Sequence, residues 1–387
     1  MPAVLSEIGP AALPTASAAG SSPSTVAVST AAIRANTSRM RELCATPVMA
    51  VVKAGGFGLG AVRAARAALA GGASELGVAT CAEAIELRRA GIDAPILAWM
   101  LHDDAPVRAA VAAGVRLSPT STAQLRRIVD AAEALRVVAE VEIEVETGMN
   151  RSGAVRGEWE RLFDAAAAAS ASGLVRVVGV WTHLSGTSPA QFTMPLARLA
   201  DAVALARSAG LRARTHAAAS RPAAIDPRTH LDLVRLGASL FGVEPEPERP
   251  LGLAPVARWQ TRVSQTRDVR AGESVGYGLT RIASATRLAL IPVGYADGIS
   301  RRSSGAGRAM TVTVGGRRCP LIGAVSMDQS VIDVGDAPVT EGDRVILLGD
   351  PARGEPSLAE WSSVVGTIPQ EVLTAIGTRV ARTEVGA

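Results

Sequence analysis

The chain has 387 residues, 48% of them hydrophobic, and carries a formal net charge of +4 at pH 7. This length predicts two or three domains around a large apolar core, and the small net charge, with no basic stripe that interleaves aromatic residues, argues against nucleic-acid binding. No apolar run reaches the length that spans a bilayer, so we expect no membrane anchor.

The first 24 residues are rich in Ala, Pro and Ser and lack the basic start and apolar block of a signal peptide. We therefore expect residues 1–24 to form a flexible tail. The three cysteines, Cys44, Cys81 and Cys319, are far apart and form no metal-spaced pair. They indicate reduced thiols in a cytoplasmic protein without a metal site.

After the tail, short apolar runs alternate with helical patterns rich in Ala, Leu and Arg. This alternation is typical of parallel strands joined by crossover helices. Eight strand candidates within 25–253 match the size of a closed (β/α)8 barrel, the α/β fold that we expect there. An open doubly wound sheet is the alternative, although no G-x-G-x-x-G follows the first strand. The candidates are residues 48–53, 75–80, 94–100, 115–119, 138–146, 175–183, 212–218 and 231–237.

From about residue 254 the pattern changes to short alternating segments bounded by Gly or Asp, such as "MTVTVGG" and "RVILLG". Such segments are typical of antiparallel strands. We expect a second, mostly β domain at 254–387 that ends in a short helix near "PQEVLTAIGTR".

Lys53, in "VVKAGGFGLG", is the only lysine, and the other 39 of the 40 basic residues are arginine. Arginine can replace lysine in salt bridges, but its guanidinium keeps its proton and cannot act as an amine nucleophile. A buried lysine can lose its proton and form a Schiff base with a carbonyl compound. Chance survival of one lysine is the alternative, so the surroundings of Lys53 must decide.

In a (β/α)8 barrel the chemistry lies at the carboxyl ends of the strands. Five residues fall there, and each alone has an ordinary alternative as a core histidine, a surface cation or a turn residue. The loops after the last two strands often bind phosphate, a role that suits Ser220 and the backbone N–H groups near Gly237 and Ala238. An amine beside a phosphate cradle predicts pyridoxal 5'-phosphate as the cofactor. The five residues are Lys53, Arg151, His183, Ser220 and Arg235.

Eight motifs after residue 25 resemble the bacterial alanine racemase family, in order and across both predicted domains. They are "VVKAGGFGLG", "VETGMNRSG", "WTHLSG", "HAAAS", "LVRLGASLFGVEP", "AGESVGYG", "PVGYADG" and "VSMDQ". The resemblance implies a fold-type III pyridoxal-phosphate enzyme. It also implies a homodimer whose active sites lie between the barrel of one chain and the β domain of the other.

The resemblance further implies two opposed bases. Lys53 would bind the cofactor and act on one face of the substrate Cα, and the partner subunit's Tyr277 would act on the other face. A phenol has a pKa of about 10 and needs tuning for this task; a His183–Arg235 network that touches the tyrosine is the implied means. Arg235 would also face the ring nitrogen of the cofactor. Because a guanidinium keeps its proton, that nitrogen would stay unprotonated, which favours proton transfer over transamination.

Arg151 is implied to hold the substrate carboxylate and the phenolic oxygen of the cofactor. Glu144 stands where many relatives carry a carbamylated lysine, whose negative charge orients the arginine, and a glutamate supplies that charge directly. The other implied residues are Tyr295, Met327 and Asp328 at the substrate and Arg301 in a supporting role.

The chain departs from the family pattern at the cofactor phosphate. Phe57 and Gln370 replace two tyrosines whose hydroxyls would contact it, and Ala219 stands where asparagine is usual. Each lost hydrogen bond to a charged group is worth about 1–3 kcal/mol, so we expect weaker cofactor binding. Gln370 also leaves open a pocket that takes serine as well as alanine, unless another residue fills the space.

The sequence therefore predicts a cytoplasmic amino-acid racemase with alanine as the default substrate. One alternative is a related pyridoxal-phosphate enzyme that acts on a different amino acid or catalyses a different reaction in specialised metabolism. Another is a non-catalytic protein that binds pyridoxal phosphate. Tyr277 and Arg235 argue against decarboxylation, and the second domain argues against a carrier built from a lone barrel.

Overall fold

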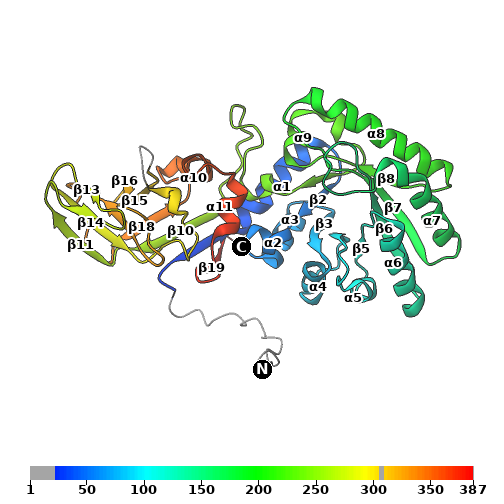
Figure 1. Cartoon of the computed structure of the whole chain (residues 1–387), viewed down its shortest axis with the longest axis horizontal. Coiled ribbons are helices and arrows are strands. Elements are labelled where there is room, and N and C mark those ends of the chain that lie inside the picture. The colour runs from blue at the N-terminus through cyan, green and yellow to red at the C-terminus, as the bar shows by residue number, and fades with distance from the viewer. Residues whose placement is uncertain (1–21, 305–308, 387) are drawn as a thin grey trace, which may run out of the picture.

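A computed structural model describes residues 22–304 and 309–386 of the chain. Most of the expected tail, residues 1–21, lies outside the described residues. The described part forms two units side by side along the long axis, a barrel of strands and helices and a mostly β domain (Figure 1).

The barrel consists of eight parallel strands in the order β8-β7-β6-β5-β4-β3-β2-β9. β9 pairs with β2, and an isolated bridge between His216 and Leu233 joins β8 to the segment before β9, so the barrel is nearly closed. The predicted (β/α)8 barrel is thus confirmed, and the doubly wound alternative is wrong. The strands are β2 (Val48–Val51), β3 (Glu75–Thr80), β4 (Ile96–Met100), β5 (Arg116–Leu117), β6 (Ala139–Glu144), β7 (Val175–Trp181), β8 (Arg214–His216) and β9 (Val234–Leu236).

Helices cover the outside of the barrel because each carries one apolar face. In α6 the buried residues Leu125, Ile128 and Ala132 recur at helical spacing, and the Ser121 side chain caps the helix start. The helices of this unit are α1 (Thr30–Cys44), α2 (Lys53–Phe57), α3 (Ala61–Ala70), α4 (Cys81–Arg89), α5 (Val107–Ala112), α6 (Thr122–Leu135), α7 (Trp159–Ala171), α8 (Pro189–Ser208) and α9 (Ser220–Ile225). Within the described ranges, no helix is long and apolar enough to cross a membrane.

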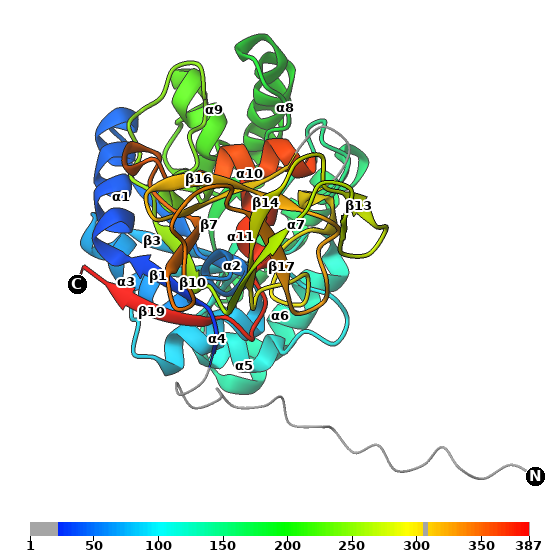
Figure 2. The same ribbon diagram turned by 90° about the vertical axis from the view of Figure 1, so that its left-hand side faces the viewer.

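The second unit contains a 9-stranded sheet in the order β11-β14-β17-β16-β15-β18-β10-β1-β19 and a two-stranded ribbon, β12-β13. Figure 2 views the molecule from this unit, with its strands in front of the barrel. Two helices, α10 (Leu358–Val365) and α11 (Pro369–Ala375), follow the sheet. The strands are β1 (Thr25–Ser29), β10 (Ala257–Arg262), β11 (Gln265–Val269), β12 (Ser274–Val275), β13 (Thr280–Arg281), β14 (Thr286–Ile291), β15 (Thr311–Val314), β16 (Arg317–Ile322), β17 (Ser330–Asp333), β18 (Arg344–Leu348) and β19 (Ala381–Val385).

Two strands of this sheet lie where the sequence predicts something else. β1 falls within the range assigned to the barrel, yet it pairs antiparallel with β10. β19 follows the helix that was expected to end the chain, and it pairs in parallel with β1. The two ends of the described chain therefore join one sheet, through long-range pairing that local patterns do not reveal.

Candidate active site

Lys53 follows β2 and opens a turn of unusual backbone conformation. The five residues after it, 54–58, all have positive φ angles, between 54° and 78°. Glycine adopts this region without steric cost, and three of the five residues are glycine, which explains "AGGFG" at this point. Within the turn the N–H of Gly58 donates to the carbonyl of Ala54 at 2.8 Å. The left-handed turn fixes Lys53 at the carboxyl end of a buried strand.

The Lys53 amine lies in a partly desolvated place between charges of both signs. Its Nζ is 5.6 Å from the centre of the Trp99 ring, near the end of β4, two strands away in the barrel. Burial and the positive charge of Arg151 lower the pKa of Lys53, and the carboxylate of Glu83 acts in the opposite direction. Glu83 also accepts a hydrogen bond from the N–H of Ala54 at 2.6 Å, so it holds the turn. A lowered pKa increases the neutral fraction of the amine, the form that reacts as a nucleophile or base.

Arg235 comes from β9, the strand paired with β2, and its positive charge also lowers the pKa of Lys53. Its guanidinium is buried and 4.6 Å from the centre of the Trp181 ring. Nη2 donates to the carbonyls of Thr182 and Ala217, and it lies 3.2 Å from Nδ1 of His183. Burial and the charge of Arg235 lower the pKa of His183 to about 3, so this histidine is neutral at neutral pH. The structure thus brings the expected His183–Arg235 pair together.

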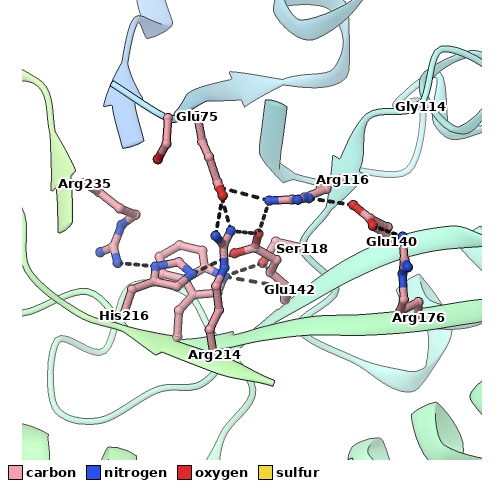
Figure 3. Close-up of polar contacts among 12 residues, drawn as sticks. Glu75, Gly114, Arg116, Ser118, Glu140, Glu142, Arg176, Arg214, His216 and Arg235 are labelled. Atoms are coloured by element: carbon pink, nitrogen blue, oxygen red, sulfur yellow. Dashed lines mark hydrogen bonds and ion pairs between the residues drawn. The ribbon is translucent and has the colours of Figure 1, made fainter. Parts of the chain in front are cut away.

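His216, which was not among the predicted site residues, completes the surroundings of Arg235. Its Nδ1 lies 2.8 Å from Nη1 of Arg235, and its Nε2 lies 2.7 Å from Oε2 of Glu142 (Figure 3). The ring is fully buried and stacks on Trp181, with centroids 5.6 Å apart. His216 is one of four histidines in the chain, and the only feature of the sequence that points to it is its place at the start of "HAAAS".

Ser220 and the segment after β9, where a phosphate site was expected, form a cluster of hydroxyl and backbone N–H groups. Ser220 Oγ lies 3.3 Å from the backbone nitrogen of Gly237 and 3.2 Å from that of Ser239. Ala238 opens the 3₁₀ helix at Ala238–Phe241, where backbone N–H groups lack partners within the helix. Phe57 is buried against this cluster, since a Cβ added to Gly237 would lie 3.1 Å from its ring, and it stacks on Phe241 at 4.5 Å.

Glu144 ends β6 and Arg151 follows it, but no ion pair joins them in the described part of the chain. Glu144 is buried and accepts a hydrogen bond from the hydroxyl of Ser152 at 2.8 Å. Burial raises its pKa, although the charges of Arg235 and Arg151 oppose that shift. The Arg151 side chain is exposed. Its role at a substrate carboxylate stays a prediction.

The remaining predicted residues lie in the second domain, most of them on its surface. Tyr277 is 71% exposed and lies between β12 and β13; β13 is at the end of the molecule that points away from the barrel (Figure 1). Tyr295 and Met327 are also exposed, and Asp328 pairs with Arg379 at 2.7 Å. Arg301 and Gln370 are the other two predicted residues of this domain. Arg301 lies 6.0 Å from the ring of Tyr295, and Oε1 of Gln370 is buried with no hydrogen-bond partner among the described residues.

Fold and site together define a (β/α)8 barrel whose strand ends carry a partly desolvated lysine amine beside a buried arginine and the histidine side chains that contact it. The family model "Alanine racemase, N-terminal domain" matches residues 28–245, and "Alanine racemase, C-terminal domain" matches residues 256–384. The chain therefore belongs to the alanine racemase family.

Individual relatives agree with this assignment over nearly the whole chain. An alanine racemase from Salinispora tropica is 44% identical over 357 residues, which cover 91% of this chain and 95% of that protein. The crystal structure of alanine racemase from D-cycloserine-producing Streptomyces lavendulae superposes with a TM-score of 0.90 at 37% identity, covering 94% of this chain and 97% of that one. Alanine racemase from Bartonella henselae, solved with covalently bound pyridoxal phosphate, gives a TM-score of 0.81 at 27% identity, covering 94% and 99% of the two chains.

Proposed function

We propose that this protein is an alanine racemase that interconverts L- and D-alanine with pyridoxal 5'-phosphate as its cofactor. The observation that carries the proposal is the convergence of the only lysine, with its pKa lowered by burial and by Arg151, on Arg235 and His183 at the carboxyl ends of the barrel strands. The racemases that resemble this chain over more than nine-tenths of its length support the same conclusion.

The residues present suit the cofactor by their chemistry. Lys53 offers an amine for its aldehyde, and the Ser220 hydroxyl with the N–H group of Ala238 offers donors to its phosphate, while the N–H group of Gly237 donates to Ser220 Oγ. Nη1 and Nη2 of Arg235 are occupied by protein acceptors, whereas Nε donates to none within the described residues, so it would be available to an acceptor such as a ring nitrogen. When bound, the cofactor supplies an aldehyde that joins the substrate amine and a conjugated ring that spreads the negative charge left when the α proton departs.

Lys53 would then exchange a proton with the substrate Cα from one face. The partner subunit's Tyr277 would exchange a proton with the opposite face, since inversion needs two bases on opposite sides. His183 keeps Nδ1 toward Arg235 and is neutral, so its Nε2–H would be free to donate to the phenol oxygen. Arg151 would hold the substrate carboxylate through its exposed guanidinium.

A homodimer with shared active sites would explain the position of Tyr277. This residue lies in the second domain of its own chain, and Tyr277, Leu279 and Met327 are apolar side chains that are each more than half exposed. Exposed apolar residues that gather on one unit indicate an interaction surface. Placing that surface of one subunit over the barrel mouth of the other would cover these residues and complete both sites.

Incubation with L-alanine in deuterated water tests the function. We expect D-alanine to appear and deuterium to enter Cα at a comparable rate, because the returned proton comes from groups that exchange with solvent. Lys53→Ala should abolish both signals, and borohydride reduction of the cofactor-loaded protein followed by peptide mapping should label the peptide that contains Lys53. Bound cofactor without either reaction would refute the proposal and support a non-catalytic protein.

A further inference from the structure

A network of polar and charged side chains extends from Arg235 through the interior of the barrel (Figure 3). It starts at Arg235, passes through His216 to Glu142, and continues through Arg214 and Arg116. Glu142 and His216 are both fully buried. Burial of a carboxylate lowers the stability of the fold unless the group is fully paired. The presence of Glu142 in the barrel interior therefore calls for a physical explanation.

The two neighbours of His216 demand one and the same tautomer. A guanidinium only donates hydrogen bonds, so Nδ1, at 2.8 Å from Arg235, must carry a lone pair. An ionised carboxylate only accepts, so Nε2, at 2.7 Å from Glu142, must carry the proton. His216 is therefore neutral, which agrees with the lowering of its pKa to about 4 by burial. Loss of either partner would free the ring to change its tautomer.

Glu142 is held in its ionised form by two arginines. Its Oε1 lies 2.6 Å from Arg214 and 3.4 Å from Arg116. Glu75 binds the same two arginines, and Glu140 binds Arg116 at 2.7 Å. With a neutral histidine, three arginines balance three carboxylates in this interior. The members are Glu75, Arg116, Glu140, Glu142, Arg214 and Arg235.

We propose that Glu142 is a positioning residue of the racemase site: through the tautomer of His216 it fixes the plane of Arg235 and keeps Nε of that arginine directed to the cofactor. The proposal rests on the proposed function. Nη2 of Arg235 has three other acceptors, whereas Nη1 has only His216 within the described residues. The contact with His216 is therefore the one that holds the Nη1 end of the guanidinium, and its loss would leave the group fixed at Nη2 alone.

Glu142→Gln tests the proposal because it keeps the shape and removes the charge. If the amide oxygen accepts from His216, the amide N–H₂ faces Arg214 and Arg116; if the N–H₂ faces His216, the ring proton moves to Nδ1 and opposes Arg235. Either arrangement weakens the hold on Arg235. We expect kcat for alanine to fall about 10–100-fold with KM changed less than about threefold, and the Kd of pyridoxal phosphate to rise about tenfold.

The matched control is Glu140→Gln, which removes one charge from the same network without touching His216. Glu140 contacts Arg116 and the exposed Arg176. We expect its kcat and cofactor Kd to stay within about twofold of the wild type, and its thermal stability to drop. Equal losses in kcat and in cofactor affinity for the two variants would show that charge balance alone matters, and would overturn the proposal.

A second measurement reads the tautomer directly and does not depend on turnover. In the cofactor-loaded protein labelled with ¹⁵N-histidine, the His216 ring, identified by loss of its signals in His216→Asn, should show an unprotonated Nδ1 and a protonated Nε2. A protonated Nδ1 in the wild type would overturn the proposal even if Glu142→Gln fails to fold. Glu142→Asp, which keeps the charge, should retain the wild-type tautomer and most of kcat. Because these spectra need no substrate, their outcome is separate from the test of racemase activity.

Discussion

Arg382, on the last strand of the second domain, donates a hydrogen bond from Nε to the carbonyl oxygen of Gly58 at 3.0 Å, in the turn that follows Lys53. Its Nη atoms donate to the carbonyls of Ile376, Gly377 and Val380, just after α11. Within the described residues no carboxylate pairs with it, and the end of a helix favours a cation. This one side chain therefore connects the lysine turn of the barrel to the second domain.

We expect Arg382→Met to lower the free energy of unfolding by about 2–4 kcal/mol, because several carbonyl groups lose a charged donor. The lysine turn should also become less ordered, so the Kd of pyridoxal phosphate should rise. Chemical unfolding and a cofactor titration measure the two effects. Arg344→Met, at an exposed position of the same domain, is the control and should change stability by less than about 0.5 kcal/mol. Similar stabilities for both variants would contradict the role given to Arg382.

The barrel could be predicted because most of its strands contain short Val/Ile/Leu runs between turn residues, and these runs alternate with helical patterns. The interior charges could not. In "VAEVEIEVE" the alternating glutamates suggest a strand with one face in water, and nothing local says that this face points into a barrel. Glu142 lies there fully buried, and its arginine partners come from β5 and β8, distant in the sequence.

The candidate site also contains residues that could be predicted from the sequence and residues that could not. Lys53, His183, Ser220 and Arg235 could be placed because each lies within two residues of the end of a predicted strand, and the barrel rule puts strand ends together. His216 is the last residue of β8 and lies within the predicted strand at 212–218. A single histidine inside a strand is usually an ordinary core residue, so the sequence did not mark it as part of the site. β19 was missed because its sequence, "ARTEV", has no apolar alternation and is held by pairing with β1 from the other end of the chain.

Acid should destabilise the protein through its buried histidines. As the pH falls through about 6.5 the unfolded chain binds a proton at His216, whereas the folded protein does not until a pKa of about 4. The unfolded state then holds more protons, so the free energy of unfolding falls across this window. At about 1.4 kcal/mol per pKa unit the loss from His216 approaches about 3 kcal/mol. His183, with a pKa lowered to about 3, acts in the same direction.

Urea unfolding at about pH 7 and about pH 4.5 measures this loss. The variant His216→Asn should show a smaller difference between the two pH values, although it starts from a lower stability because Arg235 and Glu142 lose a partner. A free energy of unfolding that is the same at both pH values in the wild type would show that the buried ring is not held neutral.

Phe57→Tyr should strengthen cofactor binding. The Phe57 ring ends against Gly237 in the donor cluster around Ser220, so a hydroxyl at the end of the ring would lie near the expected phosphate. A hydrogen bond to a charged group contributes about 1.5–3 kcal/mol, which corresponds to a Kd about 10–100-fold lower. Titration with pyridoxal, which lacks the phosphate, is the control and should give the same Kd for both proteins. An unchanged Kd for the phosphorylated form would place the phosphate elsewhere.

Mixing two inactive variants tests whether subunits share their sites. Lys53→Ala and Tyr277→Ala each remove one of the two proposed bases, so each homodimer should have little activity. In a mixed dimer one site carries both defects and the other carries both wild-type residues. Unfolding and refolding the two variants together should therefore restore up to about a quarter of wild-type activity, since about half of the dimers are mixed and each has one intact site. No recovery, with dimers shown to exchange, would mean that both bases come from one chain.

Gln370 should set how large a substrate side chain the site accepts. Its Oε1 is buried without a partner among the described residues, and α11, which carries it, packs on the lysine turn, since a Cβ added to Gly58 would lie 3.0 Å from the Leu373 carbonyl. An unpaired buried acceptor favours a substrate with a hydroxyl, because pairing removes its desolvation cost.

We expect the wild type to racemise serine as well as alanine. Gln370→Tyr, which fills the space and removes the amide, should raise the ratio of kcat/KM for alanine to that for serine by about tenfold or more. The neighbouring exposed change Glu371→Ala should leave that ratio unaltered, and a strong preference for alanine that is equal in the wild type and Gln370→Tyr would exclude Gln370 from the substrate wall.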